Sequence, residues 1–176
     1  MPSRLEGLYK VQQFAVDVTL DPNTAHPLLV LSEDRKQVHC GDVKNKLPAT
    51  PQRFSKSPNV LGKQSFSSGS SYFEVQVKGK TEWTLGVAQK SINRKRKITV
   101  CPENGFWTIW LKNDNVYEAC ADTWISLSLK HPPQKVGVFV DYDNGLVSFY
   151  DVDSAEVLFS FTGLKGYSLN HGNLHV

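Results

Sequence analysis

The stretch from Lys135 to Asp151, KVGVFVDYDNGLVSFYD, constrains the fold most, because two runs of β-branched and aromatic residues meet at Asn144-Gly145. Such runs around an Asn-Gly pair predict a β-hairpin. A two-residue type I′ turn requires positive φ at both central positions, and asparagine and glycine tolerate positive φ best. We therefore expect two adjacent antiparallel strands joined by a tight turn.

The register of this hairpin depends on the length of its turn. A two-residue turn would place Tyr142 opposite Val147 and Val140 opposite Phe149, with Val138 on the same apolar face. The other face would then also be partly covered, because Phe139 and Tyr150 point toward it. A hairpin covered on both faces is typical of the centre of a β-sandwich, and a longer loop would shift the pairing.

The chain has 176 residues, of which 40% are hydrophobic and 11% aromatic, so we expect one domain with a single core. Its net charge of +3 indicates neither a nucleic-acid partner nor a membrane partner. The first residues lack the pattern of a signal peptide, and no apolar run approaches the ~18 residues of a membrane span. These observations predict a soluble, cytoplasmic domain.

The three cysteines are Cys40, Cys101 and Cys120, an odd number without CxxC spacing. Neither a disulfide framework nor a zinc site is therefore indicated. We expect free thiols in a reducing compartment.

The first 15 residues carry Leu5, Leu8, Val11 or Gln12, and Ala15 at helical spacing. Ser3 and Glu6 occupy the positions of a capping box, which predicts a short helix. A helix of this length is marginal alone in water, so it should pack on the domain or be the end of a longer helix.

After Ala15 the pattern is that of β-strands separated by turn residues. The expected strands are 17–20, 28–32, 37–40, 72–77, 82–88, 105–111, 116–119, 126–129 and 156–161, in addition to the hairpin above. Segments 72–77 and 82–88 flank Lys78-Gly79-Lys80 and predict a second hairpin, and 47–58 reads as a loop. Strands at this spacing predict an all-β antiparallel sandwich or barrel.

Catalytic and metal-binding patterns are weak. Gly62-Lys63-Gln64-Ser65 resembles the end of a phosphate-binding loop, but Ser57 stands where that motif needs glycine. Asp141 and Asp143 resemble the start of a calcium loop whose closing glutamate is absent. The residues indicate no nucleophile with a partnering base. We expect no enzyme activity, no cofactor and no metal in this chain.

The sequence resembles the PRY-SPRY domain over about residues 14–162. The residues that carry the resemblance are VTLDPNTAHPLLVLSEDRKQVHCGD (18–42), Arg53-Phe54, VLGKQSFSSGSSYFEVQVKGKTEWTLGVA (60–88), GFWTIWL (105–111) and KVGVFVDYDNGLVSFYDV (135–152). It is closest to the form at the C-terminus of tripartite-motif ubiquitin ligases, particularly the expanded sets of fish.

The resemblance implies a bent antiparallel β-sandwich, an SPRY-like jelly roll, that binds a protein target through variable loops. Residues 1–16 would be a helical tail from a coiled coil that makes the parent protein dimeric, and 17–176 would be the PRY-SPRY domain. Catalysis in such ligases resides in a RING domain, which this chain lacks. After Phe161-Thr162-Gly163 the sequence departs from the family pattern, so the C-terminal strand is expected to be missing or divergent.

The resemblance implies a module that recognises a target or pathogen protein for a ubiquitin ligase in innate immunity, without nucleic acid or membrane as partner. One alternative is the C-terminal sensing domain of a nucleotide-oligomerising receptor. Another is a small-ligand or lectin-like sandwich, which would need a concave pocket. A third is an oligomerisation domain, which would need a self-complementary apolar patch.

Candidate contact residues come from loops with aromatic and charged groups, because interface hot spots are typically Trp, Tyr and Arg. The candidates are Trp110, Tyr117, Arg94 and Arg96, with Lys112 and Asn115 as a polar rim and Asp34 and Arg35 on a further loop. Trp107 and Trp110 are three residues apart on a strand, so one should face the core and the other could be exposed. The competing interpretation is that Trp110 belongs to the core and the arginines only solubilise a loop.

Overall fold

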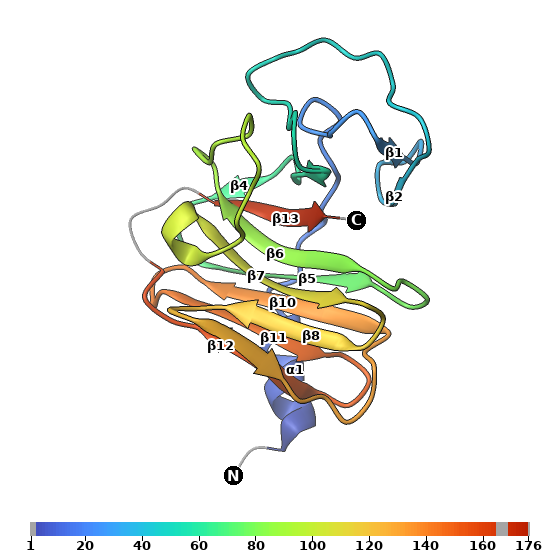
Figure 1. Cartoon of the computed structure of the whole chain (residues 1–176). Helices are drawn as coiled ribbons and strands as arrows, with labels where there is room; N and C mark the ends of the chain where they lie inside the picture. The colour runs from blue at the N-terminus through green and yellow to red at the C-terminus, as the bar shows by residue number, and fades with distance from the viewer. Residues whose placement is uncertain (1–2, 165–168, 176) are drawn as a thin grey trace. The chain divides into compact units, whose positions relative to one another are not determined.

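The computed structural model describes residues 3–164 and, for the backbone alone, residues 169–175. Figure 1 shows the strands and the α-helix of the chain, which divides into two compact units. The first comprises Met1–Asp17, Ser67–Glu82 and Ile109–Tyr167, and the second comprises Val18–Phe66, Trp83–Thr108 and Ser168–Val176. Among the described residues, no helix is long and apolar enough to cross a membrane.

The first unit contains a four-stranded antiparallel sheet in the order β12-β11-β10-β5. Its strands are β5 (Ser70–Gln76), β10 (Lys135–Asp141), β11 (Leu146–Asp151) and β12 (Glu156–Phe161). The alternation of β10 and β11 places five fully buried side chains on one face of this sheet: Val136, Val138, Val140, Val147 and Phe149. The prediction of an all-β antiparallel fold is confirmed.

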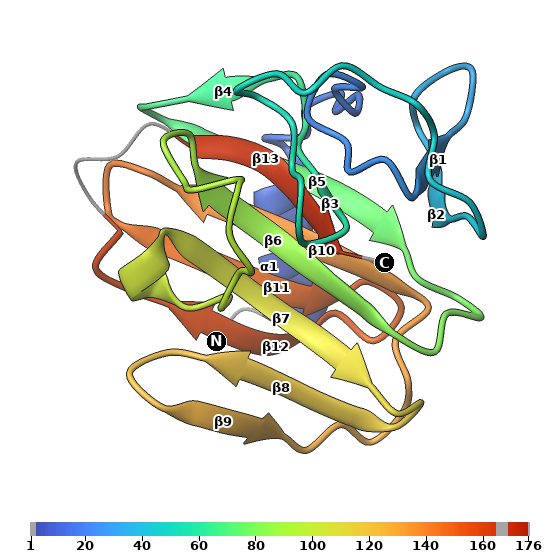
Figure 2. The ribbon, with the colours of Figure 1, turned by 45° about the horizontal axis from the view of Figure 1, so that its top comes forward.

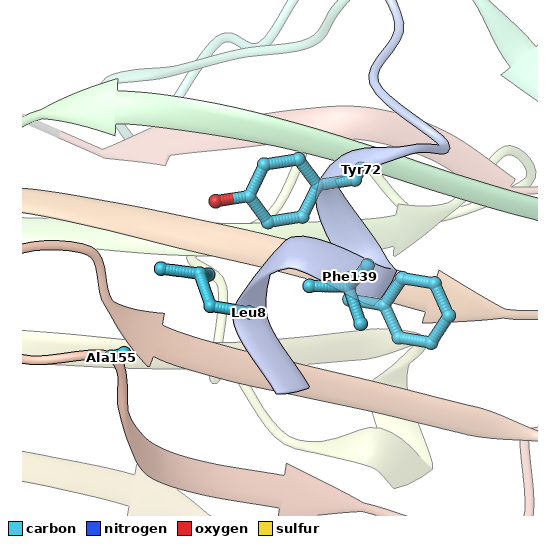
Figure 3. Packing of buried hydrophobic residues seen from close by; sticks show 5 residues of the cluster. Leu8, Tyr72, Phe139 and Ala155 are labelled. Atoms are coloured by element: carbon cyan, nitrogen blue, oxygen red, sulfur yellow. The ribbon is translucent and has the colours of Figure 1, made fainter. Parts of the chain in front are cut away.

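Helix α1 (Arg4–Gln12) packs on the opposite face of this sheet (Figure 3). Ser3 Oγ accepts from the Glu6 amide and the Glu6 side chain accepts from the Ser3 amide, so the predicted capping box is present. The buried residues of the helix, Leu8 and Val11, join a cluster with Tyr72, Phe139 and Ala155. Burial of this stripe stabilises a helix that is too short to persist alone.

The central hairpin is present, but its predicted register is wrong. Val140 pairs with Val147 and Asp141 with Leu146, so the loop has four residues instead of two. The Gly145 amide donates to the Tyr142 carbonyl, and only Gly145 in this loop has positive φ. The shift is two residues, which equals the side-chain period of a strand. The buried and outer faces therefore remain as predicted although the partners differ.

Three further strands of the first unit run side by side (Figure 2): the end of β7 (Phe106–Lys112), β8 (Val116–Cys120) and β9 (Trp124–Leu127). Strands β7 and β8 are antiparallel neighbours. Asn113 and Asp114 in their turn have φ of 51° and 70°. Two consecutive residues with positive φ, expected at Asn144-Gly145, are thus found here instead.

The second unit contains the hairpin β1 (Leu29–Leu31) and β2 (Val38–Cys40), and a sheet in the order β3-β13-β6 followed by the start of β7. In this sheet β3 is Asn59–Val60, β6 is Trp83–Gln89 and β13 is Leu169–His175, and β4 (Ser65–Phe66) also pairs with β13. A short 3-10 helix, η1 (Pro102–Asn104), precedes β7. The second unit has a hydrophobic core cluster that consists of Phe54, Leu61, Ala88, Ile92 and Phe106.

Two predictions about strands are wrong. Strand β5 pairs with β10 and β6 with β13, so segments 72–77 and 82–88 do not form a hairpin. Residues 17–20 contribute one isolated bridge, between Leu20 and Gly62, instead of a strand. A C-terminal strand is present, since β13 pairs with β3, β4 and β6, so of the two alternatives for this strand, missing or divergent, only the second is compatible with the structure.

The prediction of three free thiols is also wrong. Cys101 and Cys120 are disulfide-bonded, and Cys40 is free and exposed. Cysteine spacing in the sequence contains no sign of disulfide bonding, because a disulfide depends on proximity in the fold.

Thiol titration tests this result directly. Protein denatured without reductant should expose one reactive thiol, that of Cys40, and reduction beforehand should raise the number to three. Mass spectrometry after alkylation would locate the labelled residues. Three thiols labelled without reductant would contradict the disulfide-bonded state of Cys101 and Cys120.

The turn glycines offer a matched test of the hairpin loop. Gly145 has φ of 70°, and a Cβ placed on it would lie 2.9 Å from the Leu164 carbonyl oxygen. Gly163 has φ of 82°, and a Cβ there would meet no atom within 4 Å. Gly163→Ala should therefore cost only backbone strain, on the order of 1 kcal/mol, whereas Gly145→Ala adds a backbone clash and should cost about 2 to 3 kcal/mol. Equal losses in chemical denaturation would contradict the clash.

Candidate interaction surface

The strands β7, β8 and β9 have one core-facing side and one outer side, which their register defines. Leu111 pairs with Tyr117, and Tyr117 pairs with Leu127, so these three residues share a side with Ile109 and Ala119. That side is largely buried. The outer side carries Trp110 opposite Glu118, Lys112 opposite Val116, and Trp124 opposite Cys120.

Trp110, Lys112, Glu118 and Trp124 contact one another on the outer side, and we call this set the Trp124 face. The two indole rings meet edge to face with centroids 5.1 Å apart. Lys112 Nζ lies 2.8 Å from Glu118 Oε1 and 5.9 Å from the centroid of the Trp124 ring. Trp110 Nε1 also donates to Glu118 Oε1, at 3.4 Å. The hydrogen bond from Lys112 is the main reason that the pKa of Glu118 is lowered, and the Trp110 indole adds to it.

The indole of Trp124 is the accessible part of this face. Trp124 is 59% exposed, whereas Trp110 beneath it is only 6% exposed. A large, open aromatic ring beside a charged pair has the composition of an interface hot spot. The Lys112–Glu118 pair also gives the face one donor and one acceptor that could orient a partner.

The predicted residues are divided between the two sides. Trp110 and Lys112 belong to the Trp124 face, and Asn115 is an exposed residue of the adjoining turn. Tyr117 lies on the core side at 9% exposure, where burial raises the pKa of its phenol. The expectation that one of Trp107 and Trp110 is exposed is wrong, since both are buried.

Trp124 was missed because the predicted strand began at Ser126, which left the tryptophan in a turn. The sequence Trp124-Ile125-Ser126-Leu127 alternates, with Ile125 and Leu127 on one side and Ser126 on the other. A tryptophan on the same side as a serine is a sequence signal for an exposed aromatic residue.

Arg94 belongs to the second unit and is fixed by contacts within that unit. Its guanidinium donates to the Gln52 carbonyl at 2.8 Å and to the Lys90 carbonyl at 3.0 Å. It also lies 5.8 Å from the centre of the Phe54 ring. Partial burial lowers the pKa of Arg94. The position of Arg94 is therefore that of a structural link, whereas Arg96 is exposed.

Alanine substitutions separate these two roles. Arg94→Ala removes two charge-assisted hydrogen bonds and should lower the free energy of unfolding by about 1 to 2 kcal/mol. Arg96→Ala removes an exposed side chain and should change it by less than about 0.5 kcal/mol. Urea denaturation of both variants measures the difference. Similar values for the two would show that the bonds of Arg94 contribute little.

Asp34 and Arg35 lie in the turn between β1 and β2, also in the second unit. Asp34 Oδ1 accepts from Ser32 Oγ at 2.5 Å and from the Lys36 amide at 3.0 Å, and the bond from Ser32 is the main cause of its lowered pKa. Arg35 has φ of 60°, and its carbonyl accepts from the Leu20 amide. Local hydrogen bonds thus hold the turn, and the Arg35 side chain is exposed.

Two of the hollows among the described residues lie in the first unit. One, of about 380 Å³, is lined by Arg4, Gly7, Tyr150, Ala155, Glu156 and Val157. The other, of about 320 Å³, is lined by residues 126–131, Asp151, Ser154 and residues 156–158. Both volumes are at the low end for small-ligand sites. In the described part of the chain, no group of three metal-ligating side chains gathers.

Sequence comparison identifies two adjoining family matches. Residues 18–66 match the family model of PRY, the SPRY-associated domain, and residues 70–170 match that of the SPRY domain.

Curated relatives cover most of this chain. The erythroid membrane-associated protein of Homo sapiens is 46% identical over 156 residues, which are 89% of this chain and 33% of that protein. E3 ubiquitin-protein ligase TRIM68 of Homo sapiens is 46% identical over 160 residues, 90% of this chain and 33% of its own. E3 ubiquitin-protein ligase TRIM21 of Mus musculus is 46% identical over 148 residues, which are 84% of this chain and 31% of that protein. The chain therefore spans about a third of the length of these relatives.

Two solved structures have the same fold. The TRIM65 PSpry domain aligns with a TM-score of 0.80 at 23% identity, over 100% of this chain and 94% of that one. Stonustoxin aligns with a TM-score of 0.78 at 26% identity, over 94% of this chain and 29% of that one. At 23% identity, the match to the TRIM65 PSpry domain supports the fold alone.

Proposed function

Because the chain belongs to the SPRY domain family, we propose that it recognises a target protein on behalf of a tripartite-motif ubiquitin ligase. The observation that carries this proposal is the open indole of Trp124, supported from beneath by Trp110 and flanked by the Lys112–Glu118 pair. An aromatic anchor of this kind supplies large contact area at low entropic cost. The target would cover Trp124 and contact the exposed Asn115 turn.

A protein partner fits this surface better than a small ligand does. The Trp124 face is an exposed sheet surface, whereas ligand sites are concave and enclose most of the ligand. The two hollows are small, and in the first of them Arg4 and Glu156 already pair with each other at 2.6 Å. A lectin-like function is therefore the less favoured alternative.

The ligase itself would lie in the part of the parent protein outside this chain. TRIM68 and TRIM21 support a ubiquitin-ligase parent, and a role in innate immunity is part of the same proposal. Helix α1 would continue into a coiled coil that makes the parent dimeric. The erythroid membrane-associated relative shows that related domains also occur in proteins of other names. A receptor of the nucleotide-oligomerising class is the second candidate parent that we propose.

A cytoplasmic location is also part of the proposal. The disulfide-bonded state of Cys101 and Cys120 weighs against a reducing compartment, where such bonds are rare. Thiol labelling in intact cells, followed by mass spectrometry, would decide between a reducing compartment such as the cytoplasm and an oxidising one. Free Cys101 and Cys120 in cells would support the cytoplasm.

Affinity capture tests the contact role of Trp124. The wild-type domain and Trp124→Ala would be used as baits in parallel, and Val157→Ala is the matched control because Val157 is also apolar and is 56% exposed in the same unit. Truncation of a hot spot typically costs 2 kcal/mol or more. Partners specific to the domain should therefore bind Trp124→Ala at least about 30-fold more weakly and bind Val157→Ala normally.

The stability of Trp124→Ala should remain close to that of the wild type, because the side chain is mostly exposed. Partners lost equally from both variants would indicate a nonspecific apolar contact. Partners retained by Trp124→Ala would exclude this face as the binding site.

A further inference from the structure

Two segments of the second unit contain basic side chains and no acidic ones. Residues 44–57 contain four basic residues and residues 90–97 contain five, and neither segment contains an acidic residue. The second unit as a whole has 12 basic against 5 acidic side chains, a net charge of +7, whereas the first has 8 against 12, a net charge of −4. The net charge of +3 is therefore the sum of a basic second unit and an acidic first unit.

Hydrogen bonds join the two basic segments to each other. Arg94 donates to the Gln52 carbonyl, and the Ser55 amide donates to the Arg94 carbonyl at 3.0 Å. Lys95 Nζ donates to the carbonyls of Thr50 at 2.5 Å and Arg53 at 2.7 Å. The two segments thus form one connected surface, which we call the basic platform.

The basic residues of the platform have two roles. Arg53 is buried and donates to the carbonyls of Pro48, Pro22 and Ala25, and Arg94 and Lys95 join the segments as described. The other six are exposed: Lys44, Lys46, Lys56, Lys90, Arg96 and Lys97. Three cations therefore hold the surface together while six others face solvent. Like charges at this density repel each other, and an anionic partner would relieve that repulsion.

We propose that the basic platform is a second docking surface, which binds an acidic, extended segment of a protein. It lies in a different unit from the Trp124 face and does not require that face for binding. Backbone carbonyls fix the framework of the platform, so little of it needs to be ordered on binding. Flexible lysines and Arg96 can then pair with carboxylates that are spaced along a chain.

An acidic protein segment fits the platform better than nucleic acid does. Proteins that bind single strands combine basic grooves with exposed aromatic side chains on which bases stack. The one aromatic residue within the platform segments is Phe54, and it is buried next to Arg94. The platform therefore provides charge without a stacking surface. Val43 and Leu47 are exposed nearby, which makes an anionic membrane the second competitor to be tested.

The test measures fluorescence anisotropy of a labelled peptide of alternating glutamate and serine, with the whole chain at physiological ionic strength. The platform variant is the double substitution Arg96→Glu with Lys97→Glu. The matched control is Lys78→Glu with Lys130→Glu, which changes two exposed lysines of the first unit by the same total charge. We expect the platform variant to lose affinity at least tenfold and the control to lose less than about threefold. Binding should also weaken as salt is raised.

Competition assays with polyuridylate and with phosphatidylserine vesicles complete the test. Tighter binding of the RNA or the vesicles than of the peptide, with the same dependence on Arg96 and Lys97, would overturn the proposal in favour of that partner. Equal losses in the two double variants would reduce the effect to net charge and overturn it as well. Trp124→Ala should bind the peptide normally, so a failure of the Trp124 proposal leaves this result unaffected.

Discussion

The pairing of β10 with both β5 and β11 is the constraint on which the first unit depends. Strand β10 joins a neighbour that is close in sequence to one that is about sixty residues away. Its alternating side chains serve two cores at once, because Val136, Val138 and Val140 face one side while Phe139 faces α1 on the other. Phe139 lies opposite Tyr72 in the register, so the pairing that forms the sheet also forms the apolar surface on which α1 packs.

Local sequence patterns predicted most strands and both faces of the hairpin, because these depend on residue type and side-chain period. They predicted that β10 pairs with β11, but they did not predict the partners of β5 and β6. Gly79 has φ of 80°, as turn chemistry suggests, yet the strands on either side of it take other partners. The β10–β11 register was missed because Asn-Gly also fits the end of a longer loop, where only the glycine needs positive φ. Strand β13 was missed because LNHGNLH lacks β-branched residues, so only its neighbours specify it.

The candidate site was also only partly predictable, because local sequence shows the type of a residue but not its contacts with other strands. Charged and aromatic residues near β7 were visible in the sequence, but exposure depends on contacts between strands. Trp110 is on the outer side and is still buried, and Trp124 from β9 packs against its ring. The competing interpretation was thus correct that Trp110 is inaccessible. Its neighbour on β9 supplies the open ring that was expected of Trp110.

The run Asn93–Lys97 illustrates how one charged segment divides into different roles. Arg94 and Lys95 reach backbone carbonyls of the preceding loop and become part of the framework, while Arg96 and Lys97 remain in water. Exposed charges act over about a Debye length and mainly raise the rate of encounter, whereas a buried aromatic contact mainly lowers the rate of dissociation. Under our two proposals, the basic platform would attract an acidic partner and the Trp124 face would retain a bound one. A partner that uses both surfaces would gain affinity through effective concentration, without any further contact.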